Sequence, residues 1–310
     1  MQVAICIITC KRSEGLKRLL HGLNQLEFKL CKTPSVQIIV VDNDKDGSAY
    51  QLCQQMNLQI KWGLKYCIEE RRGIPFARNK AINCAGQNFE FDFLAFIDDD
   101  EVPQISWLDE LLHAQKLYDA DVVSGPVLPY FNQPVPDWIL KGKFFERLRY
   151  PTGHLLEGAA TNNVLISREI LQKMQPCFDE RLALSGGSDW HFFRRVHNEG
   201  YKIVWADKAL VSEWIPASRA NLVWLLKRNY RLGITESFCE VDLNPSFIVK
   251  AICIFKGLRR IIKGTLLIPL SLIWGQHEFF RTLRYIYHSF GMLVGVTGNK
   301  YQEYRKIHQV

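Results

Sequence analysis

Residues 92–101 read Asp-Phe-Leu-Ala-Phe-Ile-Asp-Asp-Asp-Glu, an apolar run that ends in four acidic side chains. The run predicts a buried β-strand, and Asp98, Asp99 and Asp100 come directly after it. Adjacent carboxylates repel one another, but they become tolerable when they share a divalent cation. Oxygen ligands favour Mg²⁺ or Mn²⁺, which commonly bridge phosphates. We therefore expect a metal–diphosphate site centred on Asp98 and Asp100, with a solvated acidic turn as the alternative.

Apolar strands alternate with amphipathic helices over the first hundred residues. Strands are predicted at 3–8, 36–41, 64–68 and 93–97, and helices beginning at Ser13, Ser48 and Pro75. This alternation predicts an α/β fold, with a mixed but mostly parallel sheet flanked by helices. In such sheets, ligands bind beyond the carboxyl ends of the strands.

Polar side chains stand at the carboxyl ends of three of these predicted strands. They are residues 9–12 after the first strand, 42–44 after the second and 98–101 after the fourth. Because parallel strands end at one edge of a sheet, we expect these groups to face the same ligand. Three separate strand ends indicate a site more strongly than the acidic run alone.

Asp189 follows two glycines and a serine at a predicted helix start. Acidic residues are favoured in the first turn of a helix, so capping is one interpretation. The other is a general base on a flexible loop, because a transferase that moves a sugar onto a hydroxyl needs one carboxylate to take the proton.

Basic residues gather in two further segments. Residues 71–79 contain three arginines near a helix start, and Arg228 and Arg231 lie on a predicted helix over 219–231. Arginine suits bidentate contacts with phosphate, although a solvated basic face is equally consistent with either segment. Glu213, after a strand-like run, is either a metal or acceptor contact or an ordinary edge-strand acid.

The composition is that of an ordinary globular protein. The chain has 310 residues, of which 47% are hydrophobic and 23% charged, enough for one large domain or a domain with an appendage. The nine cysteines show no zinc-type spacing, so we expect free thiols in a reducing compartment. The N-terminus lacks the basic start and cleavage site of a signal peptide and predicts a buried strand.

The net charge of +7 is concentrated at the C-terminal end. Residues 248–310 hold ten Lys or Arg against two acids, a net charge of +8, which leaves −1 for residues 1–247. Apolar residues interleave with the basic ones, which predicts an amphipathic helix on an anionic membrane face and no contact with nucleic acid. A helical hairpin packed against the rest of the chain is the alternative. No apolar stretch reaches the roughly 18 residues of a spanning helix.

The order of these motifs resembles a family 2 glycosyltransferase with the GT-A fold. The resemblance rests on the strand ending near Thr9, Val-Val-Asp-Asn at 40–43, Glu-Arg-Arg-Gly-Ile-Pro-Phe-Ala-Arg-Asn at 70–79, Phe-Ile-Asp-Asp-Asp-Glu at 96–101 and Gly-Gly-Ser-Asp-Trp at 186–190. It covers roughly residues 1–235 and is closest to bacterial transferases that build surface polysaccharides.

The resemblance implies a role for each matching position. Asp98 and Asp100 would be the outer members of an Asp-x-Asp motif, with Asp100 as the metal ligand for Mn²⁺ or Mg²⁺. Asp189 would be the general base of an inverting displacement. The resemblance implies that Thr9, Asp42 and Arg78 contact the base or ribose of the donor and that Asp98 lies near the ribose. From their places in the sequence, Lys11, Asn43 and Asp99 are also expected to bind the donor, and Glu213, Arg228 and Arg231 are the expected acceptor or phosphate contacts.

Two positions depart from the family pattern. Many relatives have Glu-Asp where this chain has Ser188-Asp189, so only the second acid is present. Many also have His at the position of Glu213, which weakens the implied metal or phosphate role there.

The sequence thus predicts an inverting, metal-dependent glycosyltransferase. It would move a hexose from a nucleotide sugar, such as a UDP-hexose, to a lipid-linked saccharide at the cytoplasmic face of a bacterial inner membrane. A GT-A domain would cover residues 1–235, with a nucleotide-binding half at 1–101 and an acceptor-binding half at 102–235. A helical, membrane-associated tail would cover 236–310.

Two alternatives belong to other functional classes. A sugar-phosphate nucleotidyltransferase needs a glycine-rich loop after the first strand, and residues 9–14 contain no glycine. A non-catalytic nucleotide-sugar-binding module is disfavoured by the presence of Asp98, Asp100 and Asp189 together.

Overall fold

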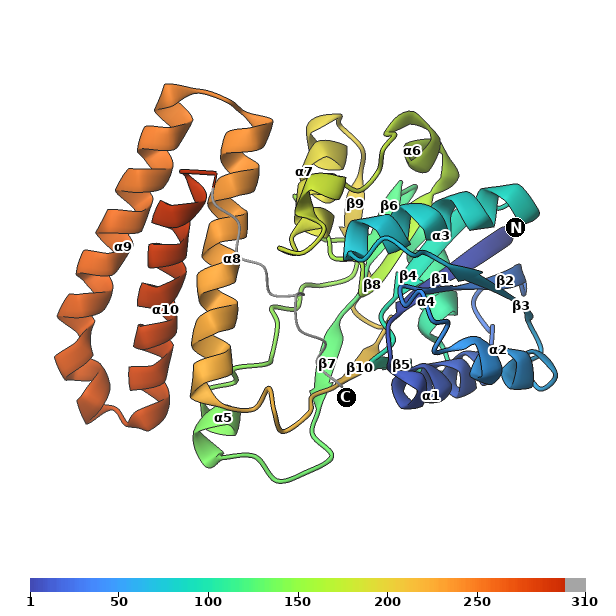
Figure 1. Ribbon diagram of the computed structural model, residues 1–310, viewed down its shortest axis with the longest axis horizontal. Helices are drawn as coiled ribbons and strands as arrows, with labels where there is room; N and C mark the ends of the chain where they lie inside the picture. Colours follow the sequence, from blue (N-terminus) through green and yellow to red (C-terminus); the bar gives the residue numbers. More distant parts are fainter. Residues whose placement is uncertain (299–310) are drawn as a thin grey trace.

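The computed structural model describes residues 1–298 (Figure 1). Its first half forms β1 (Gln2–Thr9), α1 (Ser13–Asn24), β2 (Ser35–Asp42), α2 (Tyr50–Asn57), β3 (Gly63–Ile68), α3 (Ile74–Asn88), β4 (Phe93–Ile97), β5 (Glu101–Pro103), α4 (Trp107–Tyr118), β6 (Val122–Ser124), β7 (Val127–Tyr130) and α5 (Asp137–Lys141). Its second half forms β8 (Asn163–Ser167), α6 (Arg168–Lys173), a 3-10 turn (Glu180–Leu182), α7 (Ser188–Asn198), β9 (Ile203–Trp205), β10 (Val211–Trp214), α8 (Leu222–Leu243), α9 (Phe247–Ile273) and α10 (Gln276–Gly295).

The central sheet has the strand order β3-β2-β1-β4-β8-β6-β9 within the described residues. Strands β3, β2, β1 and β4 are parallel, β8 runs antiparallel to both of its neighbours, and β6 pairs with β9 in parallel. The predicted mixed, mostly parallel α/β sheet is therefore confirmed. The continuous apolar runs of its inner strands follow from helices that cover both faces.

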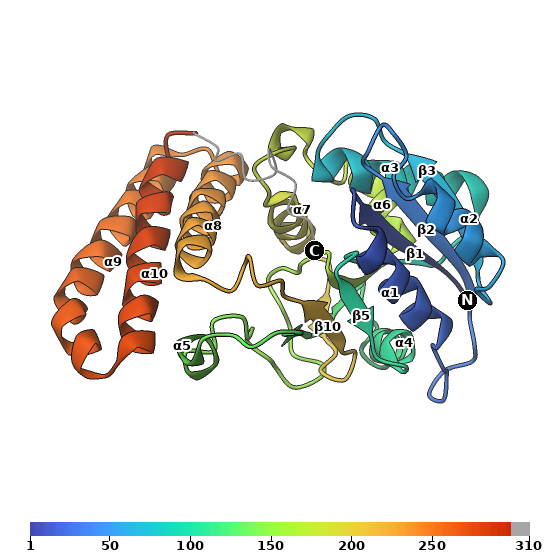
Figure 2. The same ribbon diagram turned by 60° about the horizontal axis from the view of Figure 1, so that its bottom comes forward.

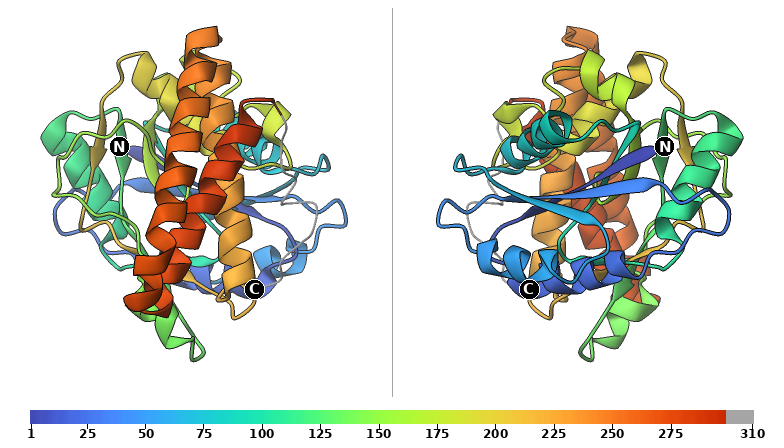
Figure 3. Two further views of the ribbon diagram at one scale, coloured as in Figure 1. Left: turned by 90° about the vertical axis from the view of Figure 1, so that its left-hand side faces the viewer. Right: turned by 90° about the vertical axis from the view of Figure 1, so that its right-hand side faces the viewer.

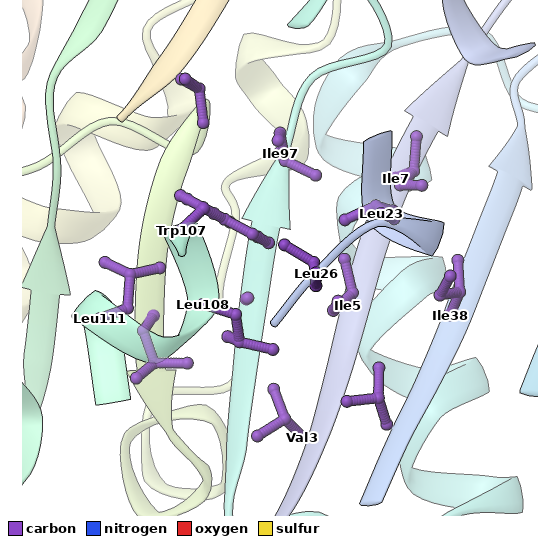
Figure 4. Close-up of a cluster of buried hydrophobic side chains, with 14 of the residues drawn as sticks. Val3, Ile5, Ile7, Leu23, Leu26, Ile38, Ile97, Trp107, Leu108 and Leu111 are labelled. Carbon is purple, nitrogen blue, oxygen red and sulfur yellow. The ribbon is translucent and has the colours of Figure 1, made fainter. Parts of the chain in front are cut away.

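Alternate residues of β1 face two separate parts of the core. Val3, Ile5 and Ile7 pack with apolar residues of α1, α2 and α4, whereas Ala4 and Cys6 face α3, α6 and α7. This is the two-residue period of a strand that is buried on both sides. Figure 4 shows the first of these clusters, in which Trp107 lies among the aliphatic side chains.

The strand register brings the polar strand ends together. Thr9, the last residue of β1, pairs with Asp42, the last residue of β2. Ile97, the last residue of β4, pairs with Asn163, the first residue of the antiparallel strand β8. The groups that follow Thr9, Asp42 and Ile97 therefore share one edge of the sheet, as predicted.

A small second sheet extends this edge. Its strand order is β5-β10-β7, and β10 pairs antiparallel with β5, so that Glu213 stands opposite Glu101. Because Glu101 belongs to the acidic run after β4, this sheet places Glu213 beside that run.

Helices α8, α9 and α10 form a helical unit at one end of the molecule, with α10 packed against both α8 and α9 (Figures 1 and 2). The helix predicted at 219–231 begins at Leu222, because the Asn221 side chain caps it by accepting from the Trp224 amide, and it continues to Leu243. The domain boundary expected between residues 235 and 236 therefore falls inside α8.

The α9–α10 hairpin packs on α8, as the second interpretation of the tail predicted, while much of α9 stays exposed. Figure 3 (left) views the molecule from the α9 side. In the described part of the chain, no helix combines the length and apolar character needed to cross a bilayer. The last basic residues of the predicted tail, Lys300, Arg305 and Lys306, lie outside the described residues.

Candidate active site

A cavity of about 1020 Å³ opens between the carboxyl edge of the sheet and helices α7 and α8. Ten of the predicted site residues line it: Thr9, Asn43, Arg78, Asp98, Asp99, Asp100, Asp189, Glu213, Arg228 and Arg231. Lys11 and Asp42 are not among the lining residues. The cavity thus brings the acidic run after β4 and the candidate base into one space.

The acidic run forms a tight turn held by its own groups and by α1. Glu101 accepts a hydrogen bond from the Asp98 amide at 3.0 Å, and the Glu101 amide donates to the Asp98 carbonyl at 3.1 Å. Helix α1 approaches the turn closely at Gly15, where a Cβ would lie only 2.5 Å from the Asp99 carbonyl oxygen. Glycine at position 15 therefore lets α1 approach the acidic turn.

Two of the three aspartates are held by protein partners. The Thr9 hydroxyl donates to Asp99 Oδ2 at 2.8 Å, and the Arg12 guanidinium reaches Asp99 at 3.0 Å and Asp100 at 3.3 Å. Arg219, from the segment before α8, donates to the same Asp100 oxygen at 3.1 Å. Thr9 and Asp99, both predicted to bind the nucleotide-sugar donor, are thus hydrogen-bonded to each other.

Asp42 and Lys11 hold the loop after β2 in place. Asp42 is fully buried and accepts from the Ala49 amide at 2.7 Å and the Tyr66 hydroxyl at 3.0 Å. Lys11 adopts a left-handed backbone conformation, and its ammonium lies 3.8 Å from Asp44. Their predicted donor contacts have no support in this geometry.

Asn43 shapes the cavity through its amide. The side chain donates to the carbonyls of Glu69 and Arg71 at 2.9 and 2.8 Å and accepts from the Gly73 amide at 2.8 Å. It thereby fixes the loop that leads into α3, and the same helix carries Arg78 into the cavity.

Asp189 lies in the first turn of α7, whose start depends on two glycines. Gly187 has a φ of 88°, and a Cβ there would lie 2.1 Å from Thr235 on α8, so only glycine fits. Asp189 accepts from the Trp190 amide at 2.9 Å, a first-turn contact of the kind that the capping interpretation predicts. Its carboxylate also lines the cavity, so the base interpretation stands beside the capping one.

Comparison with known proteins places the chain among sugar transferases. The sequence profile described as "Glycosyl transferase family 2" matches residues 4–175, more than half of the chain. The succinoglycan biosynthesis protein ExoM of Rhizobium meliloti is 34% identical over 235 residues, which cover 76% of this chain and 74% of ExoM. The chain belongs to glycosyl transferase family 2. It is a glycosyltransferase of the type found in polysaccharide biosynthesis.

Other relatives of this family 2 glycosyltransferase are more distant. The glucosyl-dolichyl phosphate glucuronosyltransferase of Haloferax volcanii is 22% identical over 262 residues, which cover 78% of this chain and 77% of that protein. The family 2 match ends at residue 175, so Asp189, Glu213 and the arginines of α8 lie beyond it.

Two solved structures resemble the whole fold. TarS of S. aureus in complex with UDP-GlcNAc matches with a TM-score of 0.55 at 14% identity, covering 94% of this chain and 91% of TarS. The mannosyltransferase PcManGT from Pyrobaculum calidifontis, in complex with GDP-Man and Mn²⁺, matches with a TM-score of 0.61 at 14% identity, covering 96% and 88%. At such identities the likeness shows the fold alone, which is the predicted GT-A fold.

The acidic turn of this glycosyltransferase suits a hard divalent cation. Burial raises the pKa of Asp98 to about 7, with Asp100 and Asp99 adding to the rise and Arg78 opposing it. Burial likewise raises the pKa of Asp99 and of Glu101. The arginines nearby therefore do not fully compensate the carboxylates, and a divalent cation would supply the missing charge. Such an ion at Asp100 would replace the contacts with Arg12 and Arg219.

A second group of possible metal ligands lies outside the cavity's acidic turn. Asp179, His191 and Asp242 bring one ligand atom each within 4.8 Å of one another. Arg181 bridges the two carboxylates, at 2.6 Å from Asp179 and 2.7 Å from Asp242. Because the guanidinium already bridges both acids, this group is better described as an ion-pair network between α7 and α8 than as the predicted metal site.

Several residues of the cavity have contacts that were not predicted. Arg12 and Arg219 hold the acidic turn, and Arg147 pairs with Glu213 at 3.1 Å. The helical unit also contributes Glu236, Lys256 and His288 to the lining. Arg12 belongs to the polar stretch after β1 that was expected to face the ligand, although its contact with the acidic turn was not predicted. The others depend on contacts between distant segments, which no local pattern indicates.

Proposed function

We propose that this family 2 glycosyltransferase transfers a hexose from a nucleotide sugar, in the first instance a UDP-sugar, to a hydroxyl of a lipid-linked saccharide with inversion. The observation that carries the proposal is the meeting of Asp98, Asp100 and Asp189 in one cavity. Residues 1–101 would bind the nucleotide, and 102–235 would bind the acceptor.

The nucleotide would lie over the sheet edge. Arg78 and Asp98 face the cavity there, and Asn43 holds the loop at its rim. Asp100, with Asp98, would hold Mg²⁺ or Mn²⁺, which when bound draws charge from the departing diphosphate. Arg219 lies 3.1 Å from Asp100, so its guanidinium is placed to contact the same diphosphate.

The displacement needs one base. The acceptor oxygen would form a bond to the anomeric carbon as the bond from that carbon to the diphosphate oxygen breaks. Asp189 would take the proton of the acceptor hydroxyl, and the electron pair of the broken bond would leave with the diphosphate. A single attack from the opposite side inverts the configuration, so no second nucleophile is required.

The helical unit supports a lipid-linked acceptor. On α9, an outer stripe of apolar side chains is exposed, opposite the face that packs on α10. The stripe consists of Ile248, Ile252, Phe255, Leu258, Ile262, Leu266, Leu270 and Ile273. Lys256, Arg259 and Lys263 flank it, a pattern typical of helices that lie on anionic membranes. The Haloferax volcanii relative is named for a dolichyl phosphate-linked substrate.

The proposed location is the cytoplasmic face of a bacterial inner membrane. All nine cysteines of the chain are free thiols, which agrees with a reducing compartment. ExoM, the relative in succinoglycan biosynthesis, is a bacterial protein.

The proposal is tested by donor turnover in the absence of acceptor. Purified protein with Mn²⁺ and a panel of nucleotide sugars should slowly release the nucleoside diphosphate from one of them. Asp100→Ala should lose both turnover and nucleotide affinity, whereas Asp189→Asn should lose transfer and keep nucleotide affinity. Formation of a nucleoside triphosphate and a sugar 1-phosphate only when pyrophosphate is added would indicate a nucleotidyltransferase, and binding without any turnover would indicate a non-catalytic module.

A further inference from the structure

One wall of the active-site cavity carries a group of arginines that the donor site does not account for. We call Arg228, Arg231 and Arg284 the arginine cluster; the first two lie on α8 and the third on α10. Arg228 and Arg231 line the cavity, one helical turn apart on the same face of α8. Arg284 lies close to Arg228, whose charge helps to lower the pKa of Arg284.

The acids near this wall are already engaged. Glu213 accepts from Arg147 at 3.1 Å and lies 3.5 Å from Arg219, and Arg219 also pairs with Asp100. In the part of the chain that the structure describes, Arg228 makes no hydrogen bond and no ion pair. Arg228 instead lies over the Trp224 ring at 5.0 Å, and Phe145 stacks on that ring at 5.8 Å. Its guanidinium is thus positioned by an aromatic surface and lacks an anion.

The electrostatics agree with this geometry. Burial lowers the pKa of Arg228, and Arg147, Arg231 and Arg219 lower it further, while Glu213 alone opposes them. Burial, with Arg228 and Arg281 nearby, lowers the pKa of Arg284 to about 10. A guanidinium is costly to remove from water without a partner, so such a group is retained where an anion binds. The fork of donors on arginine matches phosphate in particular.

We propose that the arginine cluster is a second phosphate subsite, which takes the phosphate or diphosphate joining the acceptor saccharide to its lipid carrier. This rests on the proposed function. The donor diphosphate has counter-charges of its own, because Arg12 and Arg219 are the guanidiniums in contact with Asp100. The arginine cluster lies on α8 and α10, the helices that carry α9 with its exposed apolar stripe.

The proposal also orients the acceptor. Arg228 and Asp189 line the same cavity from α8 and α7. An acceptor held by its phosphate at Arg228 would present a hydroxyl toward Asp189, so the carrier phosphate would help to decide which saccharides are used.

The test is calorimetric binding of farnesyl diphosphate to protein already saturated with UDP and Mn²⁺. The wild type should bind it, and Arg228→Gln should weaken this binding about tenfold or more, while UDP affinity stays within about twofold. Arg228→Lys keeps the charge but loses the fork and should give an intermediate loss. Lys227→Gln removes the same charge from the exposed neighbour and should change nothing. Farnesol, which lacks the diphosphate, should bind weakly to all four proteins.

Other outcomes would overturn the proposal. They are no binding to the UDP-loaded wild type, equal losses in Arg228→Gln and Lys227→Gln, or equal binding of farnesol and farnesyl diphosphate. Competition with UDP, together with a loss of UDP affinity in Arg228→Gln, would assign the cluster to the donor instead. The UDP titration that precedes this experiment reports separately on the proposed function. A protein that does not bind UDP would contradict the proposed function before farnesyl diphosphate is added.

Discussion

At the scale of single residues, arginines already contact the acidic turn where the metal ion is expected. Asp100 is the residue expected to hold the metal, yet one of its oxygens contacts both Arg12 and Arg219. An ion pair and a metal cannot use the same lone pairs at once. A metal bound at that oxygen would therefore displace at least one guanidinium, and Arg219 would then be available to the diphosphate.

Arg219→Gln tests this competition. Without the Arg219 guanidinium, the nucleotide-free protein should bind Mn²⁺ about three- to tenfold more tightly. The reason is that an ion pair such as Arg219–Asp100 contributes on the order of 1 kcal/mol. Electron paramagnetic resonance of free Mn²⁺ gives the affinity without an activity measurement. Arg149→Gln, which breaks the ion pair with Asp207 far from the turn, is the control. Unchanged or weaker Mn²⁺ binding in Arg219→Gln would contradict the competition.

At the scale of elements, local patterns sufficed for the strands but not for the walls of the site. The runs at β1, β2 and β4 could be predicted because a strand buried on both faces is apolar throughout, and the polar strand ends followed from parallel order. The contact of Arg219 with Asp100 joins residues 119 positions apart, and nothing near either residue indicates it. For the same reason the contacts of Asp42 with Ala49 and Tyr66 could not be predicted from the sequence.

The helix predicted to end at residue 231 continues to Leu243, and the reason is its packing. The helix continues past Arg231 because α10 packs closely along it, through glycines that have no local signature. A Cβ at Gly291 would lie 1.9 Å from the Tyr230 carbonyl oxygen. Tertiary contact therefore carries this helix past Arg231 and overrides the glycine at position 233.

Gly291→Ala should consequently destabilise the protein by about 1–3 kcal/mol, because the helices α8 and α10 must move apart. Gly86→Ala is the matched control, since Gly86 is a helical glycine with open space around it. That variant should be neutral or more stable by about 1 kcal/mol. Urea unfolding of both variants measures the difference, and equal stability would show that α8 and α10 do not depend on the close approach.

The network between α7 and α8 makes stability depend on pH. Burial lowers the pKa of His191 below its usual value, although Asp242 and Asp179 oppose the effect, and Arg195 adds to it. The unfolded state then binds more protons than the folded state as the pH falls through about 6.5, so stability is present above that pH and is lost below it.

The loss on acidification should be smaller in His191→Gln. Between pH 7.5 and about 5.5, the wild type should lose stability more steeply than the variant, because glutamine has no proton to bind. Thermal unfolding at each pH measures the two slopes. Asp179 and Asp242 have lowered pKa values and titrate below this window, so they do not obscure it. Equal slopes of stability against pH in the two proteins would show that His191 is not the source of the acid sensitivity.

At the scale of the whole molecule, the sheet edge, the cavity and the helical unit lie next to one another, and each contributes a different part of the proposed reaction. The sheet edge offers the acidic turn, and α7 offers Asp189. Helix α8 carries two arginines of the arginine cluster and the packing face for α10, which carries the third. Helix α9 lies at the end of the helical unit away from the sheet (Figure 2), and its outer stripe is exposed. A lipid surface could therefore contact α9 without closing the cavity, which is what a transferase with a lipid-linked acceptor requires.

Replacing Phe255, Ile262 and Leu266 of the stripe by serine tests this arrangement. Binding to vesicles of anionic phospholipid should fall at least about tenfold in cosedimentation, because each side chain would no longer bury its apolar surface. Donor hydrolysis without acceptor should be unchanged, since none of the three residues lines the cavity. Leu58→Ser, at an exposed leucine directly after α2, controls for general hydrophobicity. Equal vesicle binding by wild type and triple variant would mean that α9 meets another protein, and the membrane contact would then have to be sought elsewhere on the chain.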